Sequence, residues 1–196
     1  MNPRVVDRWD PALPAALEEV LQSGGVLVFP TDTVPGLGGD PWDRRALARV
    51  RAMKGRGEDQ PFTLHVGPLA AVGRYALVDA KATALLGRLL PGPYTVLLWA
   101  KDEAPPCAVS EGKVGLRVPR HSFFSGLMRE LGRPLFGTSA NRVGLPPLTD
   151  VDRILEAFPR VDLVITGESG SGEPSAILDL TADPPVARRG SLPQGL

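Results

Sequence analysis

Residues 26–41 read VLVFPTDTVPGLGGDP, and they contain the clearest structural signal in the chain. The continuous apolar run at 26–29 predicts a strand that is covered on both faces. Two hydroxyls and a carboxylate follow directly at 31–33, at the end of a strand where α/β sheets commonly bind ligands. Three glycines within 36–39 would let the backbone come close to a ligand. The alternative is an ordinary tight turn with local Thr and Asp hydrogen bonds.

Helical and strand patterns mix on both sides of this stretch. We expect helices to follow the N-caps Asp10, Asp40, Ser122 and Thr149, the last in a capping-box-like pattern, and another helix at 82–90. The other strands are expected at 62–66, 94–99, 114–118, 135–136, 161–165, 176–180 and 186–188. Several of these strands follow one another without a helix between them. We therefore predict a single α/β domain over residues 1–196, with an open, twisted, mixed sheet and flanking helices.

Length and composition set the class of protein. The chain has 196 residues, 43% hydrophobic and 22% charged, which is typical of a globular protein with a sizeable core. There are 22 basic and 22 acidic residues, and the formal net charge of zero argues against a generally basic, nucleic-acid-binding surface. A single cysteine, Cys107, excludes a disulfide framework. Neither a signal peptide nor a membrane-length apolar run is expected, so we expect a cytoplasmic protein.

A basic segment at residues 44–56 is the second candidate for a binding site. It holds Arg44, Arg45, Arg49, Arg51, Lys54 and Arg56 and no acid. Lys54 and Arg56 fall where the predicted helix ends, so we expect both on a turn. An ammonium beside a planar guanidinium is suited to holding a polyphosphate. The arginines before them are also explained by a solvated helix face near the C-terminal end of the helix dipole.

Two more loops follow predicted strands. Residues 137–141 (GTSAN) combine hydroxyls, an amide and backbone N–H groups that could bind an anion, although Ser and Asn also populate ordinary turns. Residues 168–175 (ESGSGEPS) are expected to be a mobile lid or a plain loop, because the chain has no phosphate-loop motif. His65, within a predicted strand, is expected to be structural. Together with His121 it has no metal-binding spacing, so no transition-metal centre is predicted.

Eight motifs occur in an order that is specific to one enzyme family. They are PTDTV with GLG at 30–38, KGR at 54–56, QP to HV at 60–66, PGPYT at 91–95, GLRVP at 115–119, TSAN at 138–141, SAILDLT at 175–181 and RRG at 188–190. Each motif alone is weak. The ordered set resembles the YrdC/TsaC family of L-threonylcarbamoyladenylate synthases, from about residue 10 to 191 and in its short form. The resemblance implies an open α/β sheet with a large, positively lined concave cavity.

The resemblance also implies a reaction. Family members convert L-threonine, bicarbonate and ATP to threonylcarbamoyl-AMP and pyrophosphate. A partner transferase complex then moves the threonylcarbamoyl group to the tRNA adenosine beside the anticodon. A carbamate formed on the threonine amine attacks the α-phosphate in line, so catalysis needs mainly positioning and charge stabilisation, with Mg²⁺ accompanying ATP. No nucleophile–His–acid set and no side-chain metal ligand are expected.

The resemblance assigns site residues by position. The catalytic positions are matched by Lys54, Arg56, Ser139 and Asn141. The threonine positions are matched by Thr33, His65, Arg117 and Ser175, with Arg117 clamping the threonine carboxylate. The nucleotide positions are matched by Arg56, Gln60, Lys113, Ser139, Asn141, Arg188 and Arg189. Arg188 and Arg189 are interchangeable at this point, because the R-x-G pattern and the distance from Ser175 disagree by one residue.

Five positions depart from the family pattern. Pro35, Gly57, Gln60, Lys113 and Gly137 stand where an aromatic residue, a proline, an asparagine, a threonine and a second serine are common. Pro35 and Gly137 bear on threonine specificity. One alternative is therefore a YciO-like paralogue that uses another carbamoyl-adenylate acceptor. The other is a non-catalytic RNA-binding module that uses the basic segment; the aromatic content of 6% argues against base stacking, while weak RNA binding stays open.

Overall fold

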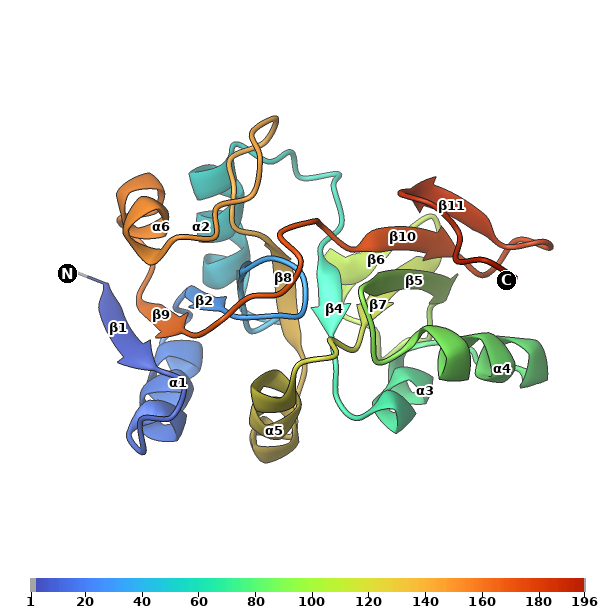
Figure 1. Cartoon of the computed structure of the whole chain (residues 1–196), viewed down its shortest axis with the longest axis horizontal. Helices are drawn as coiled ribbons and strands as arrows, with labels where there is room; N and C mark the ends of the chain where they lie inside the picture. The colour runs from blue at the N-terminus through green and yellow to red at the C-terminus, as the bar shows by residue number, and fades with distance from the viewer. Residues whose placement is uncertain (1–2, 196) are drawn as a thin grey trace. The chain divides into compact units, whose positions relative to one another are not determined.

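The apolar run at 26–29 contains a central strand of the first of two units. A computed structural model describes residues 3–195 (Figure 1). Within them, unit 1 comprises 3–60 and 135–174, and unit 2 comprises 61–134 and 175–195. The α/β class with mixed strand directions is confirmed within each unit. That residues 1–196 form a single domain stays a prediction, and Met1, Asn2 and Leu196 lie outside the described residues.

Helices and strands follow one another along the whole described chain. The helices are α1 (Leu13–Gln22), α2 (Arg44–Lys54), α3 (Val72–Tyr75), α4 (Ala80–Leu89), α5 (Ser122–Leu131) and α6 (Val151–Ala157). The strands are β1 (Arg4–Asp7), β2 (Leu27–Phe29), β3 (Gly36–Gly39), β4 (Thr63–His65), β5 (Tyr94–Trp99), β6 (Val109–Ser110), β7 (Lys113–Arg117), β8 (Leu135–Ser139), β9 (Leu163–Thr166), β10 (Ala176–Asp179) and β11 (Val186–Arg189). None of the helices in residues 3–195 has the length and apolarity that a membrane span requires.

In unit 1 the strands lie in the order β1-β9-β2-β3-β8 (Figure 1). The pairs β1–β9 and β9–β2 are parallel, whereas β2–β3 and β3–β8 are antiparallel. Helix α1 packs against β9 and α2 against β3. All three residues of β2 are buried, as the apolar run predicted. This arrangement places the C-terminal ends of β2, β8 and α2 in the same unit. Most of the polar site residues predicted for unit 1 lie at or just after these ends.

In unit 2 the order is β4-β7-β5-β10-β11, and the short β6 pairs with β7. The pairs β4–β7 and β5–β10 are parallel, and β5–β7 and β10–β11 are antiparallel. One apolar cluster forms the core and draws its side chains from these strands and from α3 and α4. Its members Val96 and Leu98 alternate along β5 with Thr95 and Leu97, which point to the opposite face.

The glycines at 36–39 have a different role from the one expected. They form strand β3, where the sequence predicted a turn in which the backbone approaches a ligand. A Cβ added at Gly38 would lie 1.8 Å from the carbonyl oxygen of Phe136, and one at Gly36 would lie 2.4 Å from the ring of Phe29. These glycines therefore allow β3 to pack closely between its neighbours, and the predicted turn at 36–39 is wrong, whereas an approach of this backbone to a ligand stays a prediction.

The predicted N-caps Asp10 and Asp40 are also wrong. Each carboxylate accepts a backbone N–H two residues further along, which closes a turn before the helix begins. Helix α1 has Ala12 at its N-cap, without a side-chain hydrogen bond. Helix α2 has Asp43, whose carboxylate accepts the N–H groups of Arg45 and Ala46. In both cases an aspartate before a proline lies close to the start of the helix, but two or three residues before the residue at the N-cap.

The other two predicted caps are off by one residue. His121, not Ser122, caps α5, because its Nδ1 accepts the N–H of Phe124 at 3.3 Å. Asp150, not Thr149, caps α6 with its carboxylate. In both cases the predicted cap and the observed cap are neighbours in the sequence, and each has a side chain that can accept a hydrogen bond.

Candidate functional site

Lys54 is the last residue of α2 and belongs to its buried face. Ala46, Val50 and Lys54 follow at intervals of four residues, so the pattern that buries the helix also buries the lysine, which is 4% exposed. Gly55 follows in the left-handed conformation and ends the helix. The prediction that Lys54 lies on a turn is therefore wrong, whereas Arg56 does follow the helix end.

The Lys54 ammonium contacts the loop that follows β8. Its Nζ donates to the carbonyl oxygens of Ser139 and Asn141, at 2.5 and 2.6 Å, and lies 3.3 Å from Asn141 Oδ1. Burial, and after it the charge of Arg56, lowers the pKa of Lys54 to about 8. The side chain is thus mainly an ammonium at neutral pH and loses its charge in mildly alkaline solution.

Ser139 and Asn141 are linked to each other. The Ser139 hydroxyl donates to Asn141 Oδ1 at 2.5 Å. The Asn141 amide donates to the carbonyls of Arg142 and Leu145, at 3.0 and 2.7 Å. The structure therefore brings Lys54, Ser139 and Asn141 together, and their catalytic role stays a prediction.

Arg56 joins the same group from the turn after α2. Its Nη1 lies 3.3 Å from the Thr138 hydroxyl, and its Nε lies 3.5 Å from the carbonyl of Gln60. Arg51 also binds the carbonyls of Gly57 and Gln60 and so holds that turn. Gln60 is thus placed near Arg56 by its main chain, and Thr138 is a neighbour that the sequence analysis did not single out as a site residue. We refer to Lys54, Arg56, Ser139 and Asn141 as the anion corner.

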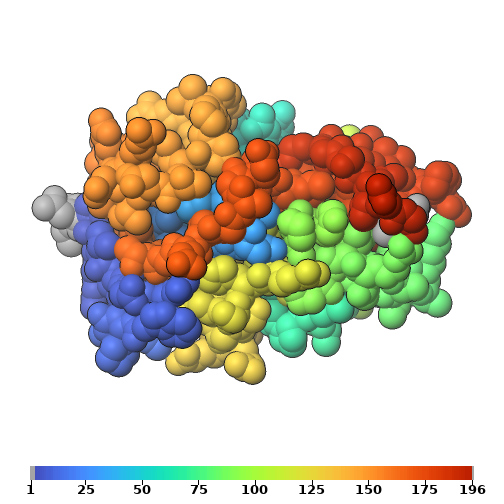
Figure 2. Space-filling model, in the orientation of Figure 1, coloured from blue at the N-terminus to red at the C-terminus, as the bar shows by residue number. Residues whose placement is uncertain are grey.

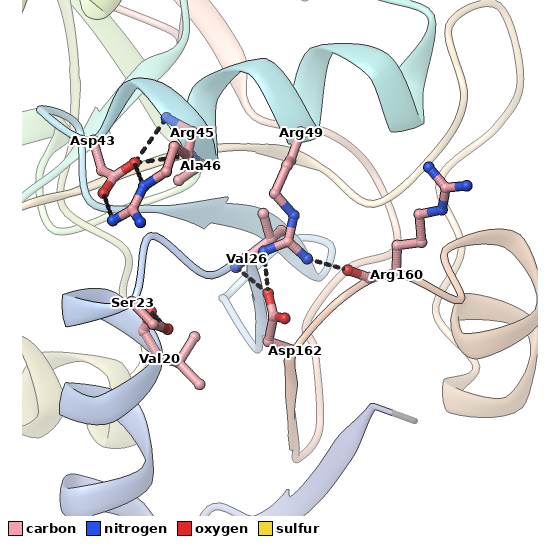
Figure 3. A network of polar contacts seen from close by, with 9 residues as sticks. All are labelled: Val20, Ser23, Val26, Asp43, Arg45, Ala46, Arg49, Arg160 and Asp162. Carbon is pink, nitrogen blue, oxygen red and sulfur yellow. Dashed lines mark hydrogen bonds and ion pairs between the residues drawn. The ribbon is translucent and has the colours of Figure 1, made fainter. Parts of the chain in front are cut away.

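The arginines earlier in α2 are used inside unit 1. Arg45 pairs with Asp43 at 2.9 Å, and Arg49 pairs with Asp162 at 2.7 Å and donates to the carbonyl of Arg160 (Figure 3). Asp162 also accepts the N–H of Val26 at 2.7 Å and so connects α2 to the start of β2. These contacts favour a structural role over an exposed phosphate-binding surface.

The loop after β2 is buried and tied to a second loop. The Thr31 hydroxyl donates to the carbonyl of Val34 at 2.7 Å and lies 3.1 Å from the hydroxyl of Thr33. The N–H groups of residues 170–172 donate to the carbonyls of residues 31–33 in register. Figure 2 shows this orange-red segment lying on the blue surface of unit 1. The 168–175 loop is therefore hydrogen-bonded over part of its length, and its movement as a lid stays a prediction.

In unit 2, His65 and Arg117 are neighbours across the parallel pair β4–β7. Both are buried, and the His65 ring contacts Phe124 edge-on, with the ring centroids 5.9 Å apart. Burial, and after it the charge of Arg117, lowers the pKa of His65 to about 3. The imidazole is therefore neutral at physiological pH, and the arginine supplies the charge of this pair.

Ser175 lies next to Thr95, with 2.9 Å between the two hydroxyl oxygens. Its carbonyl accepts two hydrogen bonds from Arg189, at 3.2 and 2.8 Å. Thr95 was not a predicted site residue, although PGPYT was part of the resemblance and Thr95 faces away from the core. Burial lowers the pKa of Arg189.

A cluster of charges surrounds the buried Asp179. Its Oδ2 accepts from Lys113 at 2.8 Å and from Arg188 at 2.8 and 3.2 Å, and its Oδ1 accepts from Thr181 at 2.6 Å. Burial opposes the charge of Asp179, but these hydrogen bonds hold its pKa well below the usual value. Asp179 was not among the predicted site residues, although it lies within SAILDLT, two strand positions beyond Ile177.

Arg188 and Arg189 are both used, for different contacts. The register of β10 against β11 shifts at Ile177 and Leu178, which is a β-bulge. Consecutive arginines would otherwise point to opposite faces, but here one reaches Asp179 and the other reaches Ser175. The one-residue ambiguity in the sequence therefore corresponds to two arginines with different partners: Arg188 contacts Asp179 at the end of β10, and Arg189 contacts Ser175 just before β10.

The Asp179 cluster lines a cavity of about 300 Å³ within unit 2. Phe62, Leu97 and Ile177 give it apolar walls, while Lys113 and Arg188 bring charge to it. The Lys113 ammonium also lies 5.3 Å from the centre of the Trp99 ring. Apolar walls with a few polar groups are typical of a small-molecule site. Residues 3–195 contain no group of three or more His, Cys, Asp or Glu that could hold a metal ion.

Residues 19–190 match the family model described as telomere recombination, which groups Sua5, YciO and YrdC. The chain is a member of the Sua5/YciO/YrdC family. The resemblance stated from the motifs is confirmed, and the family model spans both units.

Relatives in this family carry two kinds of name. The chain is 32% identical to the threonylcarbamoyl-AMP synthase of Pyrococcus abyssi over 96% of its own length and 56% of that protein. It is 34% identical to the synthase of Nitrosococcus oceani over 82% of its length and 89% of that protein. It is 32% identical to the uncharacterized protein YciO of Escherichia coli, over 87% and 85%. It thus spans little more than half of the archaeal relative.

Two solved structures share the fold. The crystal structure of E. coli YciO matches with a TM-score of 0.84 at 30% identity, over 94% of this chain and 93% of that one. P. abyssi Sua5 complexed with L-threonine matches with a TM-score of 0.83 at 29% identity, over 94% of this chain and 56% of that one. The fold and the family are therefore established together.

Proposed function

We propose that the protein is an L-threonylcarbamoyl-AMP synthase, a nucleotidyltransferase that acts on L-threonine, bicarbonate or CO₂, and ATP. The observation that carries the proposal is the buried pair Arg117 and neutral His65 in a family whose members include named synthases. A guanidinium binds a carboxylate with two parallel hydrogen bonds, and a neutral imidazole adds no second charge. The pair suits an amino acid carboxylate.

The proposed threonine-binding residues are Thr33, His65, Arg117 and Ser175. Arg117 would bind the carboxylate, while the hydroxyls supply hydrogen bonds to the amino acid. Thr95 supports this assignment because it fixes the Ser175 hydroxyl at 2.9 Å. Arg189 supports it from the other side by holding the Ser175 carbonyl. These side chains bind and orient, and none needs to act as a nucleophile.

The nucleotide residues are proposed as Arg56, Gln60, Lys113, Ser139, Asn141, Arg188 and Arg189, with Lys54, Arg56, Ser139 and Asn141 as the catalytic set. The cavity beside Lys113 and Arg188 suits an uncharged ring, because both cations are already paired with Asp179. The anion corner suits phosphates, because it brings the charges of Lys54 and Arg56 to the hydroxyl and amide groups of the loop after β8.

The proposed chemistry needs no covalent enzyme intermediate. The threonine nitrogen bonds to the carbon of CO₂ and loses a proton, giving a carbamate. A carbamate oxygen then attacks the α-phosphorus while the bond to the β-phosphate breaks, and the electron pair leaves with pyrophosphate. The protein contributes orientation and positive charge. Mg²⁺ would arrive bound to ATP as part of the substrate, and no step here relies on it.

A YciO-like paralogue is the second candidate, and one observation favours it. Lys113 stands where a threonine is common in the family, and its ammonium binds Asp179 inside the cavity. That contact changes the cavity wall and could suit another acceptor. A purely RNA-binding role is less favoured, because Arg45, Arg49 and Arg51 are committed to contacts within unit 1. A cytoplasmic location and a downstream tRNA-modifying transferase complex belong to the main proposal.

Pyrophosphate release tests the proposal directly. Purified protein is given ATP and Mg²⁺, with and without L-threonine and bicarbonate, and with L-serine as the matched amino acid. We expect release that requires both L-threonine and bicarbonate and is weak with serine. Release that is indifferent to threonine would favour the paralogue. If no pyrophosphate is released and salt-sensitive RNA binding is found instead, both enzyme proposals fail.

A further inference from the structure

We propose that His121 is a positioning residue for the proposed threonine-binding pair His65 and Arg117. It fixes the first turn of α5, and that turn carries the ring that packs against His65. All of these residues belong to unit 2. The inference rests on the proposed function only for the identity of the ligand.

His121 supplies a hydrogen-bond acceptor that α5 itself cannot. The first four N–H groups of an α-helix have no acceptor within the helix, and that of Phe124 is one of them. The Nδ1 atom of His121 accepts this N–H at 3.3 Å, while the His121 carbonyl accepts the N–H of Ser125 at 2.9 Å. The imidazole also lies edge-on to Phe123, with the ring centroids 6.3 Å apart. The first turn of α5 is therefore tied to the loop at 118–121, which follows β7.

The residue that donates to His121 also carries the ring next to His65. Phe124 is 1% exposed, and its ring lies edge-on to the His65 imidazole, with the centroids 5.9 Å apart and the planes at 72°. The capped N–H and the buried ring belong to one residue, so the cap helps to place the ring. A change in the first turn of α5 therefore reaches His65 through a single side chain.

The main chain of His65 is fixed independently of α5. His65 and Arg117 are in register across the parallel pair β4–β7, and the Val66 N–H donates to the Arg117 carbonyl at 2.9 Å. This ladder holds the point where the imidazole is attached, but it does not select the side-chain rotamer. The contact with Phe124 restricts that rotamer, because both rings are buried. We therefore expect His121 to affect the orientation of the imidazole and not the position of the strand.

The rest of α5 is held without the cap. Leu127 and Met128 are buried one turn further along. A Cβ added at Gly67 would lie 3.1 Å from the Cβ of Met128, so the helix packs closely against the chain just after β4. Gly132 ends the helix in the left-handed conformation. Loss of the cap should therefore loosen the first turn and leave the helix and the fold in place.

The imidazole NMR signals of the ligand-free protein, prepared without a histidine tag, test this placement. The chain has two histidines, so in a His121 variant the remaining ring signals belong to His65. His121→Ala removes the acceptor, whereas His121→Asn keeps a side-chain oxygen that is favoured at an N-cap. Both variants lack the His121 ring, so a difference between them reports the cap alone. We expect the His65 signals to stay at their wild-type positions in His121→Asn and to shift in His121→Ala, and identical signals in the two folded variants would overturn the proposal.

Steady-state kinetics test the consequence for the substrate. We expect His121→Ala to raise the KM for threonine about ten-fold with little change in the KM for ATP, and His121→Asn to stay within about two-fold of wild type. Asp79→Ala is the matched control, because the Asp79 carboxylate caps the ten-residue helix α4 of the same unit by accepting the N–H of Ala82 at 2.7 Å. Its threonine KM should stay within about two-fold of wild type. An equal rise in Asp79→Ala and His121→Ala would assign the effect to general destabilisation and overturn the proposal.

Phe124→Leu tests the second step, from the helix to His65. This variant keeps the capped N–H but removes the ring, so we expect the threonine KM to rise about as much as in His121→Ala. The double variant should lie within about three-fold of the weaker single variant, because both changes act through one contact; full multiplication of the two losses would contradict this. If His121→Ala does not fold, an unchanged threonine KM in Phe124→Leu overturns the proposal. If the wild type shows no threonine-dependent turnover, the proposed function fails, and the His65 signals still decide the placement.

Discussion

In unit 1, Lys54 and Asn141 direct their hydrogen bonds to main-chain carbonyls, whereas in unit 2 Lys113 and Arg188 both bind the side chain of Asp179. The first arrangement shapes a backbone loop. The second neutralises charge within a cavity wall. These four side chains are hydrogen-bonded inside the protein in both units, but they differ in what they support: loop geometry in unit 1, and side-chain placement in unit 2.

The largest effect is expected where the backbone of unit 1 is packed most closely. Gly38→Ala would place a methyl group 1.8 Å from the Phe136 carbonyl, which belongs to the neighbouring strand and cannot move independently. We expect the free energy of unfolding to fall by about 4 kcal/mol or more, or the protein not to fold. Urea unfolding measures this. Gly126→Ala in α5 is the control, because a Cβ there meets nothing within 4 Å, and a gain of about 0.5–1 kcal/mol is expected.

Arg117→Ala should have the next largest effect and separates the two substrates. The variant removes the charge that we assign to the threonine carboxylate, so we expect the KM for threonine to rise about 100-fold while the KM for ATP changes little. Steady-state pyrophosphate release measures both. Arg120→Ala serves as the control, since Arg120 is exposed and its Nε donates to the Pro91 carbonyl. An equal rise in both KM values would show that Arg117 serves a different ligand.

The smallest effect concerns the Asp179 cluster and depends on pH. The folded-state pKa of Asp179 lies below that of the unfolded chain, so its carboxylate stabilises the fold above about pH 4 and this stabilisation is lost as the pH falls further. Asp179→Asn removes the titrating group. We expect the variant to be about 1–3 kcal/mol less stable than wild type at pH 7.

The difference between wild type and Asp179→Asn should shrink as the pH falls below about 4, because the Asp179 carboxyl of the unfolded wild-type chain then takes up a proton while the folded chain still holds it charged. Urea unfolding at several pH values measures it. A constant difference down to pH 2 would mean that packing, rather than the charge of Asp179, stabilises the cavity wall.

Much of the architecture could be predicted from local patterns. The apolar run at 26–29, the helical periodicity of α5 and the strands predicted near β5 and β10 all follow from which residues must be buried. Strand β3 could not be predicted in this way. Its sequence GLGG has low strand propensity, and it is a strand because only glycine permits the close packing against Phe29 and Phe136.

The chain by itself determined the family, the α/β class and the residue types of the candidate site, because ordered motifs and hydrophobic periodicity are properties of the sequence alone. Tertiary structure decided how those residues are used. It buried Lys54 on the face of α2, placed Asp179 between Lys113 and Arg188, and turned both Arg188 and Arg189 towards β10 through a bulge. These contacts join residues far apart in the sequence, or depend on strand register, and neither follows from local spacing.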